Sequence, residues 1–270
     1  MSMHSREGTK RNADAEGRAV APVTVMAKRL DSRPSFTQAL HLLNTAQKPG
    51  HGVPAYTRWV NRRLGRLAAA AAASRGISAN GVTIASAACS LAAIACLAFA
   101  PVSPWLGLPI AVLLAAGYAL DSADGQVARL TGSSSPAGEW LDHVVDCVRV
   151  PAIHLAVLVG MWQAGVLPEW TMWLPLAYTL TSAGHFMSQI LAEQLLKDRA
   201  DSSQAPAGTL RSWLLLPTDM GTLCWVFVLW GNPELFIAAY GALFLLQLAV
   251  VAASVRRKYL ALSSPQGRQQ

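Results

Sequence analysis

Four aspartates in two closely spaced pairs are the residues of this sequence best suited to chemistry. They lie in the stretch DSADGQVARLTGSSSPAGEWLDHVVD, as Asp121 and Asp124 followed by Asp142 and Asp146. Residues three or four apart share a helix face, so each pair would present both carboxylates on one side of its helix. The segment TGSSSPA between the pairs has the composition of a turn. Two antiparallel helices would therefore bring all four carboxylates together.

Such a cluster of carboxylates favours divalent cations. Four carboxylates at one depth repel one another unless cations or protons neutralise them. Oxygen ligands without His or Cys suit Mg²⁺ or Mn²⁺ rather than zinc. A pair of divalent ions suits phosphoryl chemistry, because it neutralises a diphosphate and stabilises the entering and leaving oxygens. Nearby, Gly125 leaves room for a bulky substrate, and Arg129 offers a forked cation to a phosphate.

The composition places this site in a membrane. The chain has 270 residues, of which 53% are hydrophobic and 14% are charged, whereas soluble proteins carry about 25% charged residues. The net charge is +7, and 13 of the 22 Lys and Arg precede residue 76. In a membrane protein this bias favours contact with anionic lipids rather than nucleic acid. Because charged side chains within a span are costly, the aspartate cluster indicates a function.

The expected fold is an all-α membrane protein with six transmembrane helices and an amino-terminal amphipathic surface helix. A bilayer core needs about 20 helical residues. The predicted spans cover residues 80–100, 105–130, 138–163, 170–196, 214–230 and 235–255. Before them, residues 35–47 predict a short amphipathic helix. Residues 55–75 predict a basic helix that lies at the membrane surface, since Arg58, Arg62 and Arg66 recur every fourth residue.

The charge distribution also predicts domains and orientation. We expect a disordered cytoplasmic tail (1–35), juxtamembrane surface helices (36–75), a six-helix domain (76–262) and a short tail (263–270). The predicted loops around 101–104, 164–169 and 231–234 contain no Lys or Arg, so the positive-inside rule places both termini in the cytoplasm. At the opposite boundary we expect a belt of aromatic residues formed by Trp105, Trp162, Trp170, Trp173 and Trp230.

The aspartate motif resembles the signature of a known family. It reads D-x2-D-G-x2-A-R-x8-G-x3-D-x3-D, which is similar to the signature of the CDP-alcohol phosphotransferase (CDP-alcohol phosphatidyltransferase) family, here as a bacterial integral membrane member. Every signature position is matched, by Asp121, Asp124, Gly125, Ala128, Arg129, Gly138, Asp142 and Asp146. The resemblance implies that an acceptor hydroxyl attacks the β-phosphorus of a CDP-alcohol and that CMP leaves. This reaction belongs to phospholipid biosynthesis, and we expect the protein in the plasma membrane.

The resemblance further implies roles for individual residues. Asp121, Asp124 and Asp142 would be metal ligands, while Asp146 would contact a second ion and act as the general base. The CDP part of the donor would be bound by Gly125, Ala128, Arg129, Ser135, Asn80 and Thr83, with Gly138 as a structural glycine of the motif. The family also implies a homodimer.

Several alternatives stay open at this point. A membrane phosphatase or pyrophosphatase would share the metal site, and a cation transporter could also use an acidic cluster. Within the transferases, the donor is either CDP-diacylglycerol with a polar acceptor or a polar CDP-alcohol with a lipid acceptor. Arg149, three residues after Asp146, either neutralises the acidic cluster or contacts the substrate.

Overall fold

Helices form most of the described chain. The computed structural model describes residues 33–45, 52–196 and 209–263, and these contain no β-strand. Six helical rods run along one bundle: α4 (Ala79–Phe99), α5 (Pro104–Thr131), α6 (Pro136–Ala164), α7 (Trp173–Leu196), α9 (Met220–Val226) continued by η5 (Phe227–Gly231), and α10 (Pro233–Ser263). Most of the two expected tails (1–35 and 263–270) falls on residues outside these ranges.

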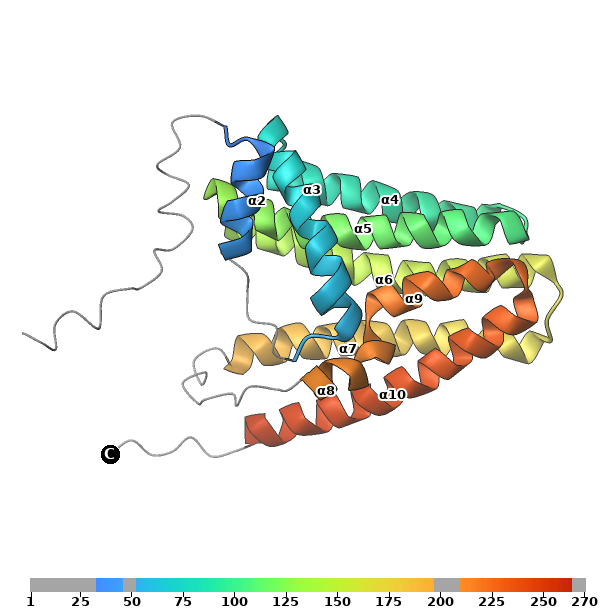
Figure 1. The fold of residues 1–270 in the computed structure, drawn as a ribbon. Coiled ribbons are helices and arrows are strands. Elements are labelled where there is room, and N and C mark those ends of the chain that lie inside the picture. Colours follow the sequence, from blue (N-terminus) through green and yellow to red (C-terminus); the bar gives the residue numbers. More distant parts are fainter. Residues whose placement is uncertain (1–32, 46–51, 197–208, 264–270) are drawn as a thin grey trace, which may run out of the picture.

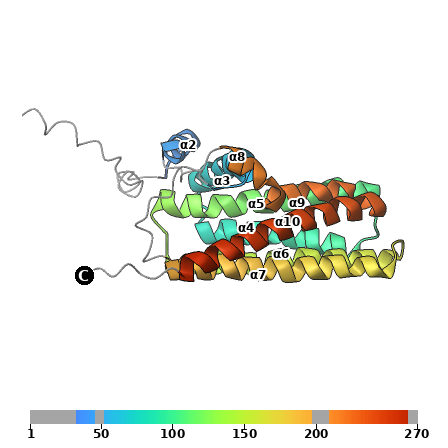
Figure 2. The ribbon, with the colours of Figure 1, turned by 90° about the horizontal axis from the view of Figure 1, so that it is seen from below.

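Shorter helices cover one end of the bundle. They are α2 (Phe36–Thr45), η1 (Thr57–Asn61), α3 (Arg62–Arg75) and α8 (Thr209–Leu214), with the single turn η4 (Leu216–Thr218). The turn η2 (Glu169–Met172) joins α6 to α7. In Figure 1, α2 and the end of α10 lie at the same end of the bundle, and the connections α4–α5, α6–α7 and η5–α10 lie at the other. Figure 2 shows α2, α3 and α8 together on one side, next to α5.

Four of the rods are long and apolar enough to cross a bilayer: α4, α5, α6 and α10. They confirm the spans predicted at 80–100, 105–130, 138–163 and 235–255. The predicted span at 170–196 becomes α7, which has 24 residues but is less apolar. The predicted span at 214–230 becomes η4, α9 and η5, whose apolar part is the shorter segment Met220–Gly231. By length and composition, therefore, four of the six spans are confirmed.

The turn between the two aspartate pairs follows from three residues. Gly132 ends α5 in the left-handed conformation, with φ of 66°, which suits glycine because it has no Cβ. Ser135 then caps α6, its Oγ accepting the N–H of Gly138 at 3.1 Å. Pro136 follows at the first helical position, where its missing N–H costs nothing. The turn predicted for TGSSSPA is thus present and reverses the chain between the pairs.

Helix α3 packs behind the first aspartate pair through small residues. Its buried positions are Gly65 and four alanines. A Cβ on Gly65 would come 2.9 Å from Ser122 Oγ, so only glycine lets α3 approach α5 this closely. Residue 122 lies between Asp121 and Asp124, so α3 supports the segment of α5 that carries the first pair.

The far half of the bundle holds an aromatic core, and one sequence prediction is wrong there. Trp105, Trp162, Trp170 and Trp173 are exposed, as a belt at the membrane boundary requires. Trp230, expected in the same belt, is fully buried and packs edge-on against Phe236 at 5.1 Å between ring centroids. From η5 its ring lies against Phe236 of α10 and beside Gly160 of α6, and burial of a large apolar ring is favourable.

We predict that Gly160→Ala destabilises this core. A Cβ at Gly160 would collide with the backbone oxygen of Leu97 and lie 2.9 Å from Trp230 Cζ2. Overpacking of this kind costs about 1–3 kcal/mol. The matched control is Gly184→Ala in α7, where a Cβ has no neighbour within 4 Å. Thermal unfolding in detergent should show a lower midpoint for Gly160→Ala alone; equal midpoints would contradict this packing.

Candidate metal and nucleotide site

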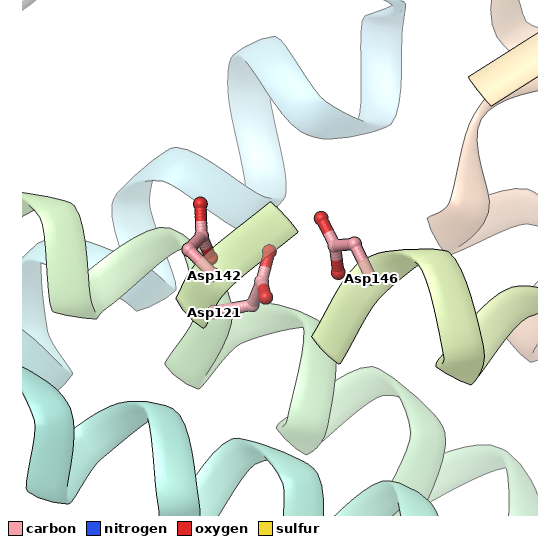
Figure 3. A group of neighbouring side chains, drawn as sticks. All are labelled: Asp121, Asp142 and Asp146. Atoms are coloured by element: carbon pink, nitrogen blue, oxygen red, sulfur yellow. The ribbon is translucent and has the colours of Figure 1, made fainter. Parts of the chain in front are cut away.

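Three of the four aspartates meet in an acidic trio: Asp121 from α5, and Asp142 and Asp146 from α6. One carboxylate oxygen from each lies within 4.8 Å of the others. Figure 3 shows the three side chains converging from the two antiparallel helices. All three are only partly exposed. The spacing of the motif and the turn at Gly132–Pro136 therefore produce the predicted convergence.

Asp124 lies next to this trio but points elsewhere. Its Oδ2 accepts the hydroxyl hydrogen of Thr83 at 2.6 Å, and its Oδ1 accepts the N–H of Gly125 at 2.5 Å. The side chain is almost fully buried. The predicted set of four carboxylates is therefore three in one cluster and a fourth held against α4.

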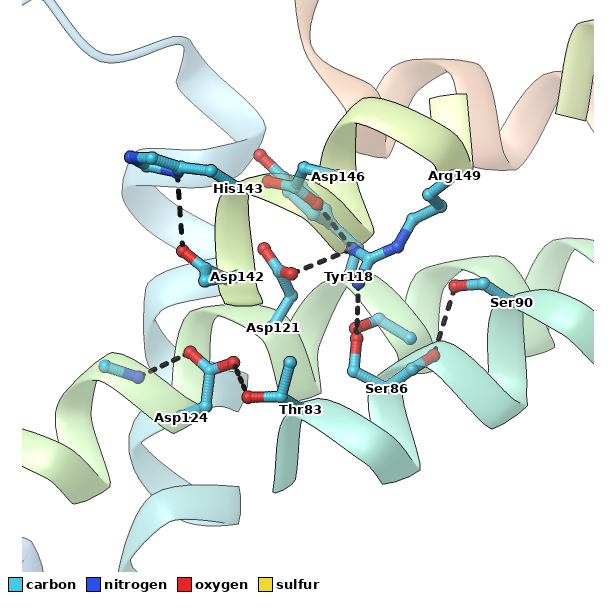
Figure 4. A network of polar contacts seen from close by, with 12 residues as sticks. Thr83, Ser86, Ser90, Tyr118, Asp121, Asp124, Asp142, His143, Asp146 and Arg149 are labelled. Carbon is cyan, nitrogen blue, oxygen red and sulfur yellow. Dashed lines mark hydrogen bonds and ion pairs between the residues drawn. The ribbon is translucent and has the colours of Figure 1, made fainter. Parts of the chain in front are cut away.

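Arg149 is the cation of the acidic trio. Its Nη1 lies 2.9 Å from Asp121 Oδ1 and 3.1 Å from Asp146 Oδ1. Figure 4 shows the guanidinium reaching in from α6 between the two carboxylates. Of the two interpretations left open by the sequence, neutralisation of the cluster is therefore the one that matches its contacts.

A cavity of about 710 Å³ opens beside Asp142, and we call it the donor cavity. Small-molecule sites commonly measure about 300–1,000 Å³. Every residue expected to bind the donor lines it, as does Gly138: Asn80, Thr83, Gly125, Ala128, Arg129 and Ser135. Glu139 and Glu193 also line it. Arg129 makes no salt bridge within the part of the chain that the structure describes, so its charge is available to a ligand.

Three donor-cavity residues also hold the site together. Thr83 binds Asp124, and Ser135 caps α6. A Cβ on Gly138 would lie 3.3 Å from Ser135 Oγ and 3.7 Å from Asn80 Oδ1. A side chain at 138 would thus be tight against the Ser135 cap and would touch Asn80 at the start of α4. This close packing explains why the motif has a glycine at position 138.

A second cavity, of about 180 Å³, lies on the other side of the trio. Asp146 lines it, and it shares no lining residue with the donor cavity. Its polar residues include His154, His185, Gln189 and Gln247 from α6, α7 and α10, and Thr218 and Asp219 from the segment before α9. Asp142 and Asp146 thus face different cavities, with Asp121 between them.

Asp219 is a residue at this second cavity that the sequence did not assign. It is buried and accepts the N–H of Thr57 at 2.7 Å and the Thr57 hydroxyl at 2.9 Å. It also caps α9 by accepting the N–H of Gly221. Thr57 and Asp219 are 162 residues apart, so only the fold brings them together. Asp219 thus links the start of η1 to the start of α9.

The trio fits Mg²⁺ or Mn²⁺. Its ligands are carboxylate oxygens only, which hard divalent cations prefer. Arg149 contacts the Oδ1 atoms of Asp121 and Asp146, so their Oδ2 atoms and both oxygens of Asp142 lie outside this ion pair. Within the described residues, this is the one group of His, Cys, Asp and Glu that meets the geometry of a metal site.

Comparison with known proteins agrees with the geometry. The profile of the CDP-alcohol phosphatidyltransferase family matches residues 77–255. That range runs from just before α4 to within α10 and contains the trio and both cavities. The chain belongs to this family. Together with four helices suited to crossing a bilayer, the match defines a multi-pass membrane protein.

Two curated relatives resemble a shorter stretch. Cholinephosphotransferase 1 of Xenopus laevis is 38% identical over 66 residues, which are 24% of this chain and 16% of that protein. A protein of Dictyostelium discoideum, described as uncharacterized CDP-alcohol phosphatidyltransferase class-I family protein 2, is 42% identical over 67 residues, 25% of this chain and 16% of its own. The alignments thus span about a sixth of each relative.

Proposed function

We propose that this protein transfers a substituted phosphate from a CDP-alcohol to a hydroxyl acceptor and releases CMP, as a step of phospholipid biosynthesis. One observation carries the proposal. The acidic trio lies between two cavities, and the larger of the two is lined by all the residues that the family resemblance assigns to the donor. A reaction between two substrates needs two adjoining pockets that share one reactive centre.

The donor cavity supports binding of the nucleotide diphosphate. Arg129 would bind a phosphate through its forked guanidinium. Gly125 leaves the cavity wall open, since a Cβ there would meet only Arg129 Nη1, at 3.4 Å. Asn80, Thr83 and Ser135 add polar groups from α4 and from the turn. The donor's β-phosphate would then lie over the trio.

The two cavities support different roles for the four aspartates. Asp121, Asp124 and Asp142 would hold the divalent ions, Mg²⁺ or Mn²⁺. When bound, two such ions would neutralise the diphosphate and stabilise the oxygen of the departing CMP. Asp146 faces the second cavity, where it would orient the acceptor hydroxyl and take its proton. That proton has to leave as the new P–O bond forms and the bond to CMP breaks.

The membrane arrangement completes the proposal. We propose that α7 and the α9–η5 rod cross the bilayer together with α4, α5, α6 and α10. An even number of spans would bring α2 and the end of α10 to the same, cytoplasmic side of the plasma membrane. Helix α3 would lie at the surface, where Arg62, Arg63 and Arg66 meet lipid phosphates. A homodimer stays a prediction from the family resemblance.

Two donor–acceptor orders fit this site, and they differ in the group that is transferred. A relative named cholinephosphotransferase favours a polar phosphoalcohol as the group transferred, with a lipid hydroxyl as acceptor. CDP-diacylglycerol with a polar acceptor is the reverse order. Both orders use the same trio and the same donor cavity.

One assay tests the function and its metal dependence. The purified full chain is incubated with a panel that includes CDP-choline and CDP-diacylglycerol, each with candidate lipid or polar alcohols and Mg²⁺. We expect CMP release only when donor and acceptor are both present. EDTA should abolish it, and added Mg²⁺ or Mn²⁺ should restore it, because the carboxylates cannot neutralise a diphosphate.

Other outcomes of this assay identify the rival functions. CMP release without any added alcohol would indicate a phosphatase or pyrophosphatase. Cation flux into vesicles without nucleotide, and no CMP release from any pair, would indicate a transporter. Either result would overturn the proposed function.

A further inference from the structure

Among the described residues that line the donor cavity, none has a large apolar side chain. The apolar part of the lining consists of two alanines, two glycines and Pro136, and the other residues are polar or charged. The second cavity differs, since Val150, Phe186 and Leu223 line it together with its polar residues. Because hydrocarbon gains little from contact with a polar wall, the donor cavity suits a small polar alcohol better than a lipid.

The charges of the donor cavity are divided between its walls. Arg129 of α5 is the one Lys or Arg among the described lining residues, whereas Glu139 comes from α6 and Glu193 from α7. Neither glutamate makes a salt bridge within the part of the chain that the structure describes. In the proposed function the divalent ions would occupy Asp124 and Asp142, which leaves the two glutamates without a counter-charge.

The two glutamates lie where the alcohol of the donor would extend. Glu139 precedes Asp142 by three residues, so the two share a face of α6, and Glu193 lines the same cavity from the last turn of α7. A donor with its diphosphate at Arg129 and the trio would therefore place its alcohol next to both carboxylates. Both glutamates are exposed, so they can attract a cation without the cost of burying a pair of charges.

We propose that Glu139 and Glu193 are specificity-determining residues that bind a cationic alcohol of the donor, so that the transferred group is the phosphate ester of an amino alcohol with a primary or quaternary ammonium. This inference rests on the proposed function and selects one of its two orders, with a polar CDP-alcohol as donor and a lipid alcohol as acceptor. The carboxylates attract an ammonium and offer no apolar contact to acyl chains. The acceptor oxygen still bonds to the β-phosphorus as the bond to CMP breaks, and its proton passes to Asp146.

Donor binding to the purified full chain, measured by isothermal titration with Mg²⁺ and without acceptor, tests this proposal. The probes are CDP-choline and its neutral analogue in which carbon replaces the choline nitrogen. They have the same shape and differ by one charge. We expect the wild type to bind CDP-choline about tenfold more tightly, because the analogue loses two partly screened ion pairs. Equal affinity for the two probes would overturn the proposal.

Glutamine variants connect this preference to the two carboxylates. Glu139→Gln and Glu193→Gln should each reduce the preference for CDP-choline about threefold, and the double variant should bind both probes equally. Affinity for the neutral analogue should stay at the wild-type value, because Arg129 and the trio are unchanged. The matched control is Glu234→Gln. Like Glu139, Glu234 is an exposed acid in the first turn of its helix, but α10 begins at the other end of the bundle (Figure 1), so this variant should leave both affinities unchanged.

The specificity role can fail separately from the proposed function. An equal loss of affinity for both probes in the glutamine variants would assign the glutamates to the shape of the cavity and overturn the role. CMP release only from CDP-diacylglycerol with polar alcohols would also overturn it, while it would support the proposed function. A wild-type chain that prefers CDP-choline but releases no CMP with any acceptor would instead defeat the proposed function. If the variants do not fold, the comparison of the two probes on the wild type decides.

Discussion

Asp146→Asn is expected to reduce turnover by about a hundredfold to ten-thousandfold, the usual contribution of a positioned general base. Affinity for the CDP donor should stay close to that of the wild type, because Asp146 lines the second cavity and not the donor cavity. Asparagine keeps the size of the side chain but cannot accept a proton. The kcat of CMP release and the donor KM, measured together, test this separation.

The control for this variant is an acid at the other end of the bundle. Glu169→Gln changes an exposed carboxylate in η2, away from both cavities, and should leave kcat and KM unchanged. Wild-type turnover in Asp146→Asn would remove Asp146 from the mechanism. A large rise in donor KM with unchanged kcat would move it to the donor site.

The aspartate trio could be predicted because its determinants are local. The i, i+3 and i, i+4 spacings define two helix faces, and Gly132, Ser135 and Pro136 define the turn that folds one helix back on the other. The lining of the donor cavity was also predictable, since most of its residues lie in the same stretch of sequence, between residues 124 and 143. The four confirmed spans followed from hydropathy alone.

The features that could not be predicted from the sequence depend on contacts between residues far apart in the chain. Asp219 looks like one scattered acid until the fold sets Thr57 against it. The anchor of Arg149 is Ser86, 63 residues earlier in the chain, and a single serine in an apolar helix carries no signal. Trp230 was placed on the surface because a tryptophan near a span end is typical of a belt, and only its packing against Phe236 shows that it is buried.

The acidic side chains also show what the helical spacing of residues predicts and what it does not. Asp121 and Asp124 share a helix face, yet only Asp121 joins the trio, because the Thr83 hydroxyl and the Gly125 N–H hold the Asp124 carboxylate. Periodicity predicts which side of a helix a residue occupies, within about half a turn. The neighbouring helix determines which partner each carboxylate binds.

Arg129→Ala is expected to raise the donor KM by about tenfold to a hundredfold and to change kcat much less. Hydrogen bonds to a charged group contribute about 1.5–3 kcal/mol, and this arginine would lose its contact to a donor phosphate in both the ground and transition states. Its guanidinium lines the donor cavity without a salt bridge to any described residue. Removing it therefore frees no buried carboxylate, so the fold should be unaffected.

Arg129→Lys distinguishes a forked contact from a simple charge. Lysine keeps the positive charge but cannot bind two phosphate oxygens in one plane, so we expect a donor KM between those of the wild type and Arg129→Ala. The same KM as the wild type would mean that charge alone is needed. An unchanged KM in both variants would exclude Arg129 from donor binding, and the nucleotide would then have to bind outside the cavity that this arginine lines.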